Sequence, residues 1–464
     1  MGKTKLRDVE SLRKYKMNNK KISVIGLGKL GLCSAACFAS KGYKVIGVDI
    51  DSHRVDLINK GQNPIQETNL TETLKKCKDN LKATTDYKEA IGNSDVTFII
   101  VATPSEADGS FSNQQLEESL KAIGLSLKDK NSYHLAVIAS TVMPGTCEHV
   151  GKFILEETSG KKCGKDFGII YSPAFIALGS VIYDFLNPDF LLIGEINKKD
   201  GDILEEIYKN TCDNNPKFGR MNLVSAEIAK ISLNCYVTMK ITYANSLAAI
   251  CEKIPGADSQ IITSSIGMDT RIGEKYLKPG LGYGGPCFPR DNGAFAAFAR
   301  KIGEKAKLAE MVDEVNRDQV ERIEKIVKDL VKESNKTKDE VFVGVLGLSY
   351  KPNTPIIEDS QAIDIVELLI NEGYKVIVYD PQGLDTARGV LGDEVKYAKS
   401  SKECAEEADI LLIATPWDEF KEISNNDLKK GVYILDCWEI LKSKNLEANI
   451  KYLGKGLTRM KEEG

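Results

Sequence analysis

The sequence predicts an α/β protein in which two Rossmann-like, doubly wound parallel-sheet domains are joined by a helical central dimerisation domain. Three observations predict this fold class. Short apolar stretches alternate with helical stretches near the N-terminus, the same alternation returns after residue 340, and the segment 226–251 between them contains no Gly or Pro. Alternating strands and helices indicate a parallel sheet, whose strands are apolar throughout because helices cover both faces.

The first sheet domain is predicted over residues 21–210. Residues 22–28 (ISVIGLG) are predicted as a strand that ends in glycines, and residues 29–41 as a helix of small side chains. The next strand, at 44–50, ends in an acid. Two more buried strands are expected at 96–102 and 135–139.

The central domain is predicted over residues 211–320 and the C-terminal domain over residues 321–464. Apolar residues occur on all sides of the 226–251 helix, so we expect it to be largely buried against other helices or another subunit. A charged helical stretch between residues 304 and 334 connects the two domains. The opening pattern then returns, with strands expected at 341–348, 375–380 and 410–416 and a helix at 360–371.

Composition excludes several classes of function. The chain has 464 residues, and its 63 Lys and Arg against 67 Asp and Glu give a net charge of −4, which argues against nucleic acid or an anionic membrane as a partner. No apolar run approaches the roughly 18 residues that span a bilayer. Residues 1–20 form a basic leader without the apolar core of a secretory signal. The 11 cysteines include no Cys-x-x-Cys pair, so we expect core thiols in a reducing cytoplasm and no metal site.

A dinucleotide site is predicted at the first turn, Gly26-x-Gly28-x-x-Gly31. The glycines permit a tight turn, close approach to a pyrophosphate and close packing of the helix, whose N-terminus then faces the phosphates. Asp49 closes the next strand, where an acid accepts hydrogen bonds from a ribose diol. No Arg immediately follows the acid, which favours NAD over NADP. The alternative is a Rossmann-like turn that binds nothing.

A reactive thiol is predicted in the loop Gly282–Asp291, which is dense in Gly and Pro and carries Cys287. A thiolate is the nucleophilic form of cysteine, and a nearby Arg and exposed backbone amides favour it. Lys230 and Asn234 lie four residues apart, so they share one face of the central helix and suit the stabilisation of an oxyanion. The alternatives are a tight turn with a buried Cys and a lysine at the edge of the helix.

Taken together, these stretches resemble the UDP-glucose/GDP-mannose dehydrogenase family over nearly the whole chain from Lys21 to Asp436. The pairing of a GYGG-x-CFP loop with a lysine–asparagine helix is highly specific for it. The matching segments are VIGLGKLGL, Ser140-Thr141-Val142, Asn187-Pro188-Asp189, AEIAKISLN, Arg271-Ile272-Gly273, PGLGYGGPCFPRD and Gly347–Thr354.

The resemblance implies oxidation of the C6 hydroxyl of a nucleotide sugar to a carboxylate with NAD as the cofactor, and UDP-glucose as the expected substrate. It implies that Asp291, with a water, assists removal of the alcohol proton, and that Cys287 forms a thiohemiacetal and then a thioester. Lys230 and Asn234 are expected to stabilise oxyanions, and Thr141 to help place water.

The remaining contacts implied by the resemblance form two sets. The cofactor set comprises Gly26, Gly28, Leu30, Gly31, Asp49, Arg54, Thr103 and Arg290. The substrate set comprises Lys230, Asn234, Arg271, Tyr276, Tyr283, Gly284 and Lys351. Lys351 is expected near the diphosphate. Arg271 is expected to reach the substrate of a neighbouring subunit, which makes the central helix the core of a homodimer.

The chain departs from the family pattern at three places. Ala174 and Leu178 occupy positions where the family usually carries glutamates, the first associated with thioester hydrolysis and the second with contacts near the cofactor. Glu358 replaces an arginine that contacts cofactor, and Arg290 replaces a lysine. Two alternatives therefore stay open: a related oxidoreductase with another sugar or end point, and a catalytically silent nucleotide-sugar binder that regulates a partner.

Overall fold

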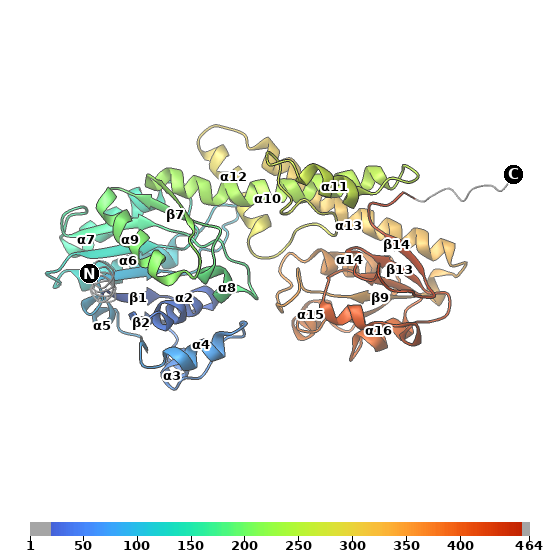
Figure 1. Ribbon diagram of the computed structural model, residues 1–464, viewed down its shortest axis with the longest axis horizontal. Helices are drawn as coiled ribbons and strands as arrows, with labels where there is room; N and C mark the ends of the chain where they lie inside the picture. The colour runs from blue at the N-terminus through green and yellow to red at the C-terminus, as the bar shows by residue number, and fades with distance from the viewer. Residues whose placement is uncertain (1–19, 457–464) are drawn as a thin grey trace, which may run out of the picture. The chain divides into compact units, whose positions relative to one another are not determined.

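The computed structural model describes residues 20–456, so the predicted leader at 1–20 lies, except for Lys20, outside the described residues. The chain divides into two compact units, Met1–Ile231 and Ser232–Gly464. Each unit contains one sheet, drawn in blue to green for the first and orange to red for the second in Figure 1.

The first unit is built on an eight-stranded sheet in the order β3-β2-β1-β4-β5-β6-β7-β8. Neighbouring strands run parallel except β6 and β7, which are antiparallel. The strands are β1 (Lys21–Ile25), β2 (Lys44–Val48), β3 (Leu81–Thr84), β4 (Val96–Ile99), β5 (His134–Ile138), β6 (Phe167–Tyr171), β7 (Phe190–Glu195) and β8 (Lys217–Met221).

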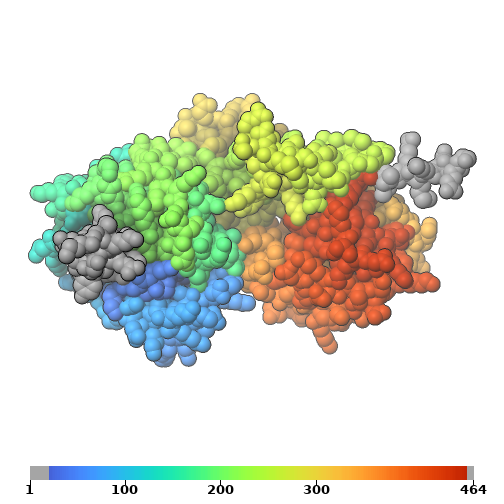
Figure 2. Space-filling view, viewed as in Figure 1, coloured from blue at the N-terminus to red at the C-terminus, as the bar shows by residue number. Residues whose placement is uncertain are grey.

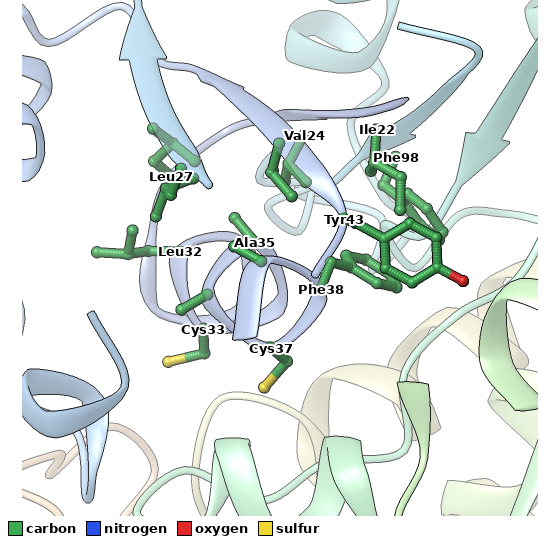
Figure 3. Packing of buried hydrophobic residues seen from close by; sticks show 14 of the residues in the cluster. Ile22, Val24, Leu27, Leu32, Cys33, Ala35, Cys37, Phe38, Tyr43 and Phe98 are labelled. Carbon is green, nitrogen blue, oxygen red and sulfur yellow. The ribbon is translucent and has the colours of Figure 1, made fainter. Parts of the chain in front are cut away.

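Helices form a separate apolar cluster on each face of this sheet. On one face, Phe38 of α2 packs against Phe98 of β4 with ring centroids 4.7 Å apart (Figure 3). Cys33 and Cys37 are buried on the side of α2 that points away from Val24. The helices are α2 (Lys29–Ser40), α3 (Ser52–Asn59), α4 (Leu70–Cys77), α5 (Tyr87–Gly92), α6 (Gln114–Leu127), the π-helix η1 (Thr146–Gly151), α7 (Lys152–Ser159), α8 (Val181–Leu186) and α9 (Lys198–Thr211).

The second unit combines central helices with a six-stranded, fully parallel sheet in the order β11-β10-β9-β12-β13-β14. Its strands are β9 (Phe342–Leu346), β10 (Lys375–Tyr379), β11 (Lys396–Tyr397), β12 (Ile410–Ile413), β13 (Tyr433–Asp436) and β14 (Asn449–Tyr452). Its helices are α11 (Ser259–Gly267), α12 (Phe288–Lys301), α13 (Lys307–Glu333), α14 (Gln361–Asn371), α15 (Leu384–Leu391) and α16 (Ser401–Glu407), with short 3-10 turns η2 (Lys338–Glu340), η3 (Asp418–Glu422) and η4 (Asn425–Asp427).

The helix α11 lies against the end of the described chain within the second unit. Ser259 N donates to Gly454 O over 2.9 Å. Figure 2 shows this yellow-green segment at the surface beside red C-terminal residues. Ile261 of this helix and Met268, which directly follows it, are exposed.

The predicted fold class is confirmed, because the first six strands of the first sheet and the six strands of the second are connected in the same order. The predicted strand at 22–28 ends earlier, at Ile25, since Gly26 turns the chain with φ +87°. The sequence predictions do not include β3, β6, β7, β8, β11, β13 and β14. The strands β3 and β11 are only four and two residues long, and the antiparallel direction of β7 leaves no mark in its own residues.

The long helix α10 (Leu223–Cys251) begins in the first unit and ends in the second. In the single chain, this helix, predicted to be largely buried against other helices or another subunit, leaves five large apolar residues exposed: Val224, Ile228, Tyr236, Tyr243 and Ile250. Within residues 20–456, no helix has both the length and the apolar character needed to cross a membrane.

Candidate functional site

The glycine turn after β1 leaves an open space at the N-terminus of α2. A Cβ at Gly31 would lie 1.8 Å from Gly26 O, so only glycine lets the helix approach the strand this closely. No atom lies within 4 Å of the position of a Cβ on Gly28. Backbone N–H groups at a helix start attract anions, and this turn therefore suits a pyrophosphate.

Asp49 follows β2 and faces the same turn. One of its carboxylate oxygens, Oδ2, accepts a 2.7 Å hydrogen bond from Leu27 N, and Arg54 Nη1 lies 3.0 Å from that oxygen. Leu30, also predicted to contact cofactor, packs against the apolar core under the turn. The glycines, the helix start and the acid together fit a dinucleotide.

The equivalent acid of the second sheet is Asp380, and protein groups surround its carboxylate. Leu348 N and Ser349 N donate to Oδ2 over 2.7 and 2.9 Å, and Gly383 N donates to Oδ1 over 2.6 Å. Trp417 Nε1 donates as well, over 3.2 Å. This acid therefore fixes its own turn instead of offering its oxygens to a ribose.

The loop after β5 carries Thr141. Thr103 Oγ1, on the loop after β4, donates to Thr141 O over 2.7 Å. Ser140 Oγ accepts from Val101 N and donates to Val101 O, over 2.9 and 2.7 Å. The predicted cofactor residue Thr103 thus holds the backbone of the predicted catalytic residue Thr141.

Lys230 is 7% exposed on the first turns of α10. Its Nζ donates to Ala174 O over 3.0 Å and lies 4.5 Å from the centroid of the Phe175 ring. The lysine is therefore directed at the loop that carries Ala174 and Leu178.

That loop still receives a carboxylate from another part of the chain. Glu67 accepts hydrogen bonds from Gly179 N and Val181 N, over 3.1 and 3.3 Å. Leu178 packs against the apolar core. Sequence reasoning missed Glu67, because the loop it contacts lies more than one hundred residues away.

In the second unit, Cys287 is the one exposed thiol among the eleven cysteines, all of which lie within the described residues. It occupies the N-cap position of α12, where the positive end of the helix dipole favours a negative group. Burial raises the pKa of the other thiols, for example that of Cys77 to about 11 and that of Cys37 to about 12. Burial therefore disfavours the thiolate, the nucleophilic form, at the ten remaining thiols.

Asp291 is fully buried one helical turn after Cys287. Asn234 Nδ2 donates to its Oδ2 over 2.6 Å, and Arg290 Nη2 donates to its Oδ1 over 3.1 Å. The structure therefore brings two predicted residues, Asn234 and Arg290, to the carboxylate of a third, Asp291. Lys230 and Asn234 lie one turn apart on the same helix, as the spacing predicts.

Four amide side chains, which we call the amide clamp, hold the backbone that precedes Cys287. Asn245 accepts from Gly280 N over 2.9 Å, and Gln319 donates to Gly280 O over 2.9 Å. Asn316 both accepts from Tyr283 N and donates to Tyr283 O, each over 2.9 Å. The fourth residue, Gln361, accepts from Gly282 N over 2.6 Å. All four are buried, so the loop has a fixed backbone.

Two predicted substrate residues are part of this framework. The hydroxyl of Tyr283 accepts from Asn292 over 2.9 Å and donates to Asp313 over 3.2 Å, and burial raises its pKa. A Cβ at Gly284 would lie 2.1 Å from Asp359 O. The loop thus packs against the segment between β9 and α14 of the C-terminal sheet domain.

The other predicted substrate residues are at least partly accessible in the second unit, and the ring of Tyr276 packs edge-on against Phe288, next to Cys287, with centroids 6.3 Å apart. Arg271 has a side chain 86% exposed that pairs with Asp269 over 2.6 Å. Tyr276 has φ +63° and is 52% exposed. Lys351 Nζ lies 6.0 Å from the Tyr350 ring. No group of three or more His, Cys, Asp or Glu between residues 20 and 456 is arranged to hold a metal ion.

Three models of the UDP-glucose/GDP-mannose dehydrogenase family match the chain. The NAD-binding domain matches residues 20–212, the central domain residues 224–318 and the UDP-binding domain residues 344–443. The glycine turn lies in the first match, the Cys287 loop in the second and Lys351 in the third.

Individual relatives are similar over most of their length. UDP-glucose 6-dehydrogenase of Haloferax volcanii is 38% identical over 407 residues, which cover 87% of this chain and 93% of that protein. GDP-mannose 6-dehydrogenase of Pseudomonas aeruginosa is 34% identical over 384 residues, covering 82% and 85%. The solved structure of a UDP-glucose dehydrogenase from Pyrobaculum islandicum has a TM-score of 0.83 and 32% identity, covering 94% and 97%. These relatives are named for different sugars.

Proposed function

Because the chain belongs to the UDP-glucose/GDP-mannose dehydrogenase family, whose members are NAD-dependent oxidoreductases of nucleotide sugars, we propose that it oxidises C6 of UDP-glucose to give UDP-glucuronate. One observation carries the chemical part of this proposal. The exposed thiol of Cys287 lies at the N-terminus of α12, one turn from a buried carboxylate that Asn234 and Arg290 hold. A nucleophile beside a positioned acid suits covalent oxidation of an aldehyde.

The proposed reaction removes four electrons from one carbon. NAD, held at the glycine turn between Gly26 and Gly31 and at Asp49, would supply the acceptor for one hydride from C6 in each of two oxidations. In the first, Asp291 and a water take the proton of the C6 alcohol. The Sγ of Cys287 then adds to the aldehyde carbon, and Lys230 and Asn234 stabilise the thiohemiacetal oxygen.

The second oxidation converts the thiohemiacetal to a thioester. Water, placed with the help of Thr141, adds to the thioester carbonyl, the carbon–sulfur bond breaks and the Cys287 thiol is regenerated. One alcohol, one water and two NAD thus give one carboxylate, two NADH and three protons. Holding the aldehyde on sulfur keeps it from water between the two oxidations.

The test is a panel of nucleotide sugars with NAD, in which NADH is counted per sugar and the product is identified by mass. We expect two NADH per UDP-glucose for the wild-type protein and loss of turnover in Cys287→Ala. Cys163→Ala, which changes a partly buried thiol of the first unit, is the matched control. If NADH forms only with GDP-mannose or a UDP-N-acetylhexosamine, UDP-glucose is not the substrate and that nucleotide sugar is.

Ala174, Leu178 and Glu358 favour a second candidate, a related enzyme with a different end point. General acid–base help is worth about 10²–10⁴-fold, so the missing glutamates would slow release of the thioester. Two NADH per protein chain followed by no further turnover, with the mass of the oxidised nucleotide sugar added to Cys287, would identify a stalled thioester. One NADH per sugar with a free aldehyde product would identify an end point after the first oxidation. A protein that binds nucleotide sugar and forms no NADH would instead be the silent regulator.

We also propose a homodimer through α10, in a cytoplasmic enzyme with the three domains 21–210, 211–320 and 321–464. Tyr236, Tyr243 and Ile250 are each more than half exposed and recur every seven residues, the period of helices that pair side by side. We expect Tyr243→Glu to halve the mass measured by light scattering. Phe153→Glu, an exposed aromatic residue of α7, is the control and should leave the mass unchanged.

A further inference from the structure

Glu227 is a fully buried acid on the first turns of α10, and the proposed chemistry does not use it. Its Oε2 accepts a hydrogen bond from Gly145 N over 2.5 Å, and its Oε1 accepts one from Cys147 N over 2.7 Å. A single side chain of α10 therefore binds two backbone groups of the segment that follows β5.

Those two backbone groups lie where a turn becomes a helix. Gly145 has φ +93°, and the π-helix η1 begins at Thr146. The first N–H groups of a helix have no acceptor within it, so a buried helix start needs a partner from elsewhere. Glu227 is that partner, and its charge is favourable at a helix N-terminus.

The segment that Glu227 holds also carries Thr141. Ser140 is fixed by Val101, and the carbonyl of Thr141 by Thr103. These contacts define the beginning of the segment, while Glu227 defines its end at Gly145. Thr141 therefore lies on a short stretch of backbone that is anchored on both sides.

Lys230 lies three residues after Glu227, close to one helical turn further along α10. Its Nζ is directed at Ala174 O. Glu227 thus ties the helix that carries Lys230 to the segment that carries Thr141, within the first unit.

We propose that Glu227 is a positioning residue that sets Thr141 relative to Lys230 during oxidation of the sugar. This inference rests on the proposed function. Glu227 does not touch reacting atoms in it: the carboxylate acts through the backbone of residues 141–147. A displacement of the order of 1 Å at reacting groups can cost about 10²-fold in rate.

A merely structural role makes a different prediction. Burial raises the pKa of Glu227, which the N–H groups of Cys147 and Gly145 and the charge of His149 oppose. A buried charge is weak support for stability in itself. Loss of a structural carboxylate would lower the melting temperature and leave kcat of the folded protein unchanged.

The experiment compares Glu227→Gln with Asp200→Asn in the full-length protein. Asp200 is the matched control, since it is a fully buried carboxylate of the same unit that accepts from Tyr133 and Asn197, over 2.6 and 2.7 Å. We expect Glu227→Gln to lower kcat for NADH formation by about 10²-fold with KM for NAD changed by less than about twofold. Asp200→Asn should lower the melting temperature and keep kcat.

Two further measurements make the result decisive. Hydrogen exchange at the amides of Gly145 and Cys147 should accelerate in Glu227→Gln and stay slow in Asp200→Asn. Glu227→Asp keeps the charge on a shorter side chain and should recover part of kcat; it also carries the test if the Gln variant does not fold. Equal loss of kcat in the Glu227 and Asp200 variants, or unchanged exchange in Glu227→Gln, would overturn the proposal.

Failure of the proposed function is separate from these results. A folded wild-type protein that forms no NADH with any nucleotide sugar overturns the function. In that case, hydrogen exchange at Gly145 and Cys147 in the Glu227 and Asp200 variants still shows whether Glu227 holds residues 141–147.

Discussion

The side-chain amide of Asn234 donates a 2.6 Å hydrogen bond to the carboxylate of Asp291, and both groups are buried. Asn234 lies on α10 and Asp291 on α12, so the contact joins two helices of the second unit at the turn that follows Cys287. Its short length and burial make it a strong, charge-assisted interaction.

Removing this donor should affect activity more than stability. We expect Asn234→Ala to lower kcat/KM for the nucleotide sugar by about 10²–10³-fold, the usual loss for one donor at a reactive centre. The free energy of unfolding should fall by about 1–3 kcal/mol, since a buried carboxylate oxygen loses a partner. Asn93→Ala, at the exposed end of α5, is a control that should change neither quantity. Unchanged kcat/KM in Asn234→Ala would contradict the role.

The two equivalent acids of the sheets should respond in opposite ways. Asp49→Asn should weaken NAD binding by about 10–100-fold, because a hydrogen bond to a charged group is worth about 1.5–3 kcal/mol. Asp380→Asn should lower the melting temperature and leave NAD affinity unchanged, since backbone N–H groups and Trp417 Nε1 hold its carboxylate, whereas one partner of Asp49 is the partly exposed side chain of Arg54. Fluorescence titration with NAD and thermal melts measure both. An equal loss of NAD affinity in the two variants would contradict the different roles of Asp49 and Asp380.

The amide clamp can be tested at the residue that makes two of its hydrogen bonds. Asn316→Leu leaves the N–H and the carbonyl of Tyr283 without their partner. We expect the free energy of unfolding to fall by about 2–4 kcal/mol, from two buried backbone groups at about 1–3 kcal/mol each. The reaction of the Cys287 thiol with iodoacetamide should also show more than one rate, because the loop would adopt more than one conformation. Asn371→Leu, at the exposed end of α14, should keep both properties of the wild type.

A buried histidine makes stability depend on pH in a defined direction. Burial, together with the charge of Lys130, lowers the pKa of His134 to about 3. Between that value and the ordinary pKa near 6.5, the unfolded chain binds a proton that the folded chain does not, so stability falls as pH decreases. The slope from this group is at most about 1.4 kcal/mol per pH unit.

Denaturant titrations between about pH 5 and 6.5 measure this slope above the range where most carboxylates titrate. His134→Asn should flatten it, whereas His53→Asn, which changes an exposed histidine, should not. An unchanged slope in His134→Asn would show that other groups cause the acid sensitivity.

Features that depend on neighbouring residues in the sequence could be predicted from it. The glycines at 26, 28 and 31, the acid at 49 and the pair Lys230 and Asn234 each follow a local period or spacing, and the structure places them as that spacing requires. The packing of Phe38 against Phe98 likewise follows from apolar helices on apolar strands.

Features made by distant residues could not be predicted in this way. The amide clamp takes its members from α10, α13 and α14, and nothing local to Asn245 or Gln361 marks them. Asn316 and Gln319 share one face of α13, a weak signal that two buried amides serve one purpose. Glu227 in an apolar helix is a stronger signal than these amides. A carboxylate that is buried needs hydrogen-bond partners, so its presence there indicates contact with another segment.

The amide clamp also limits how the chain can be divided experimentally. Gly285 N donates to Glu358 O over 3.0 Å, and Gln361 accepts from Gly282 N, so the thiol loop is attached to residues beyond the predicted boundary at 320. A truncated protein that ends at that boundary would lose these attachments. Expression trials that seek a minimal reactive fragment should therefore retain the C-terminal sheet, and chimeras that exchange nucleotide-binding halves should exchange the loop with it.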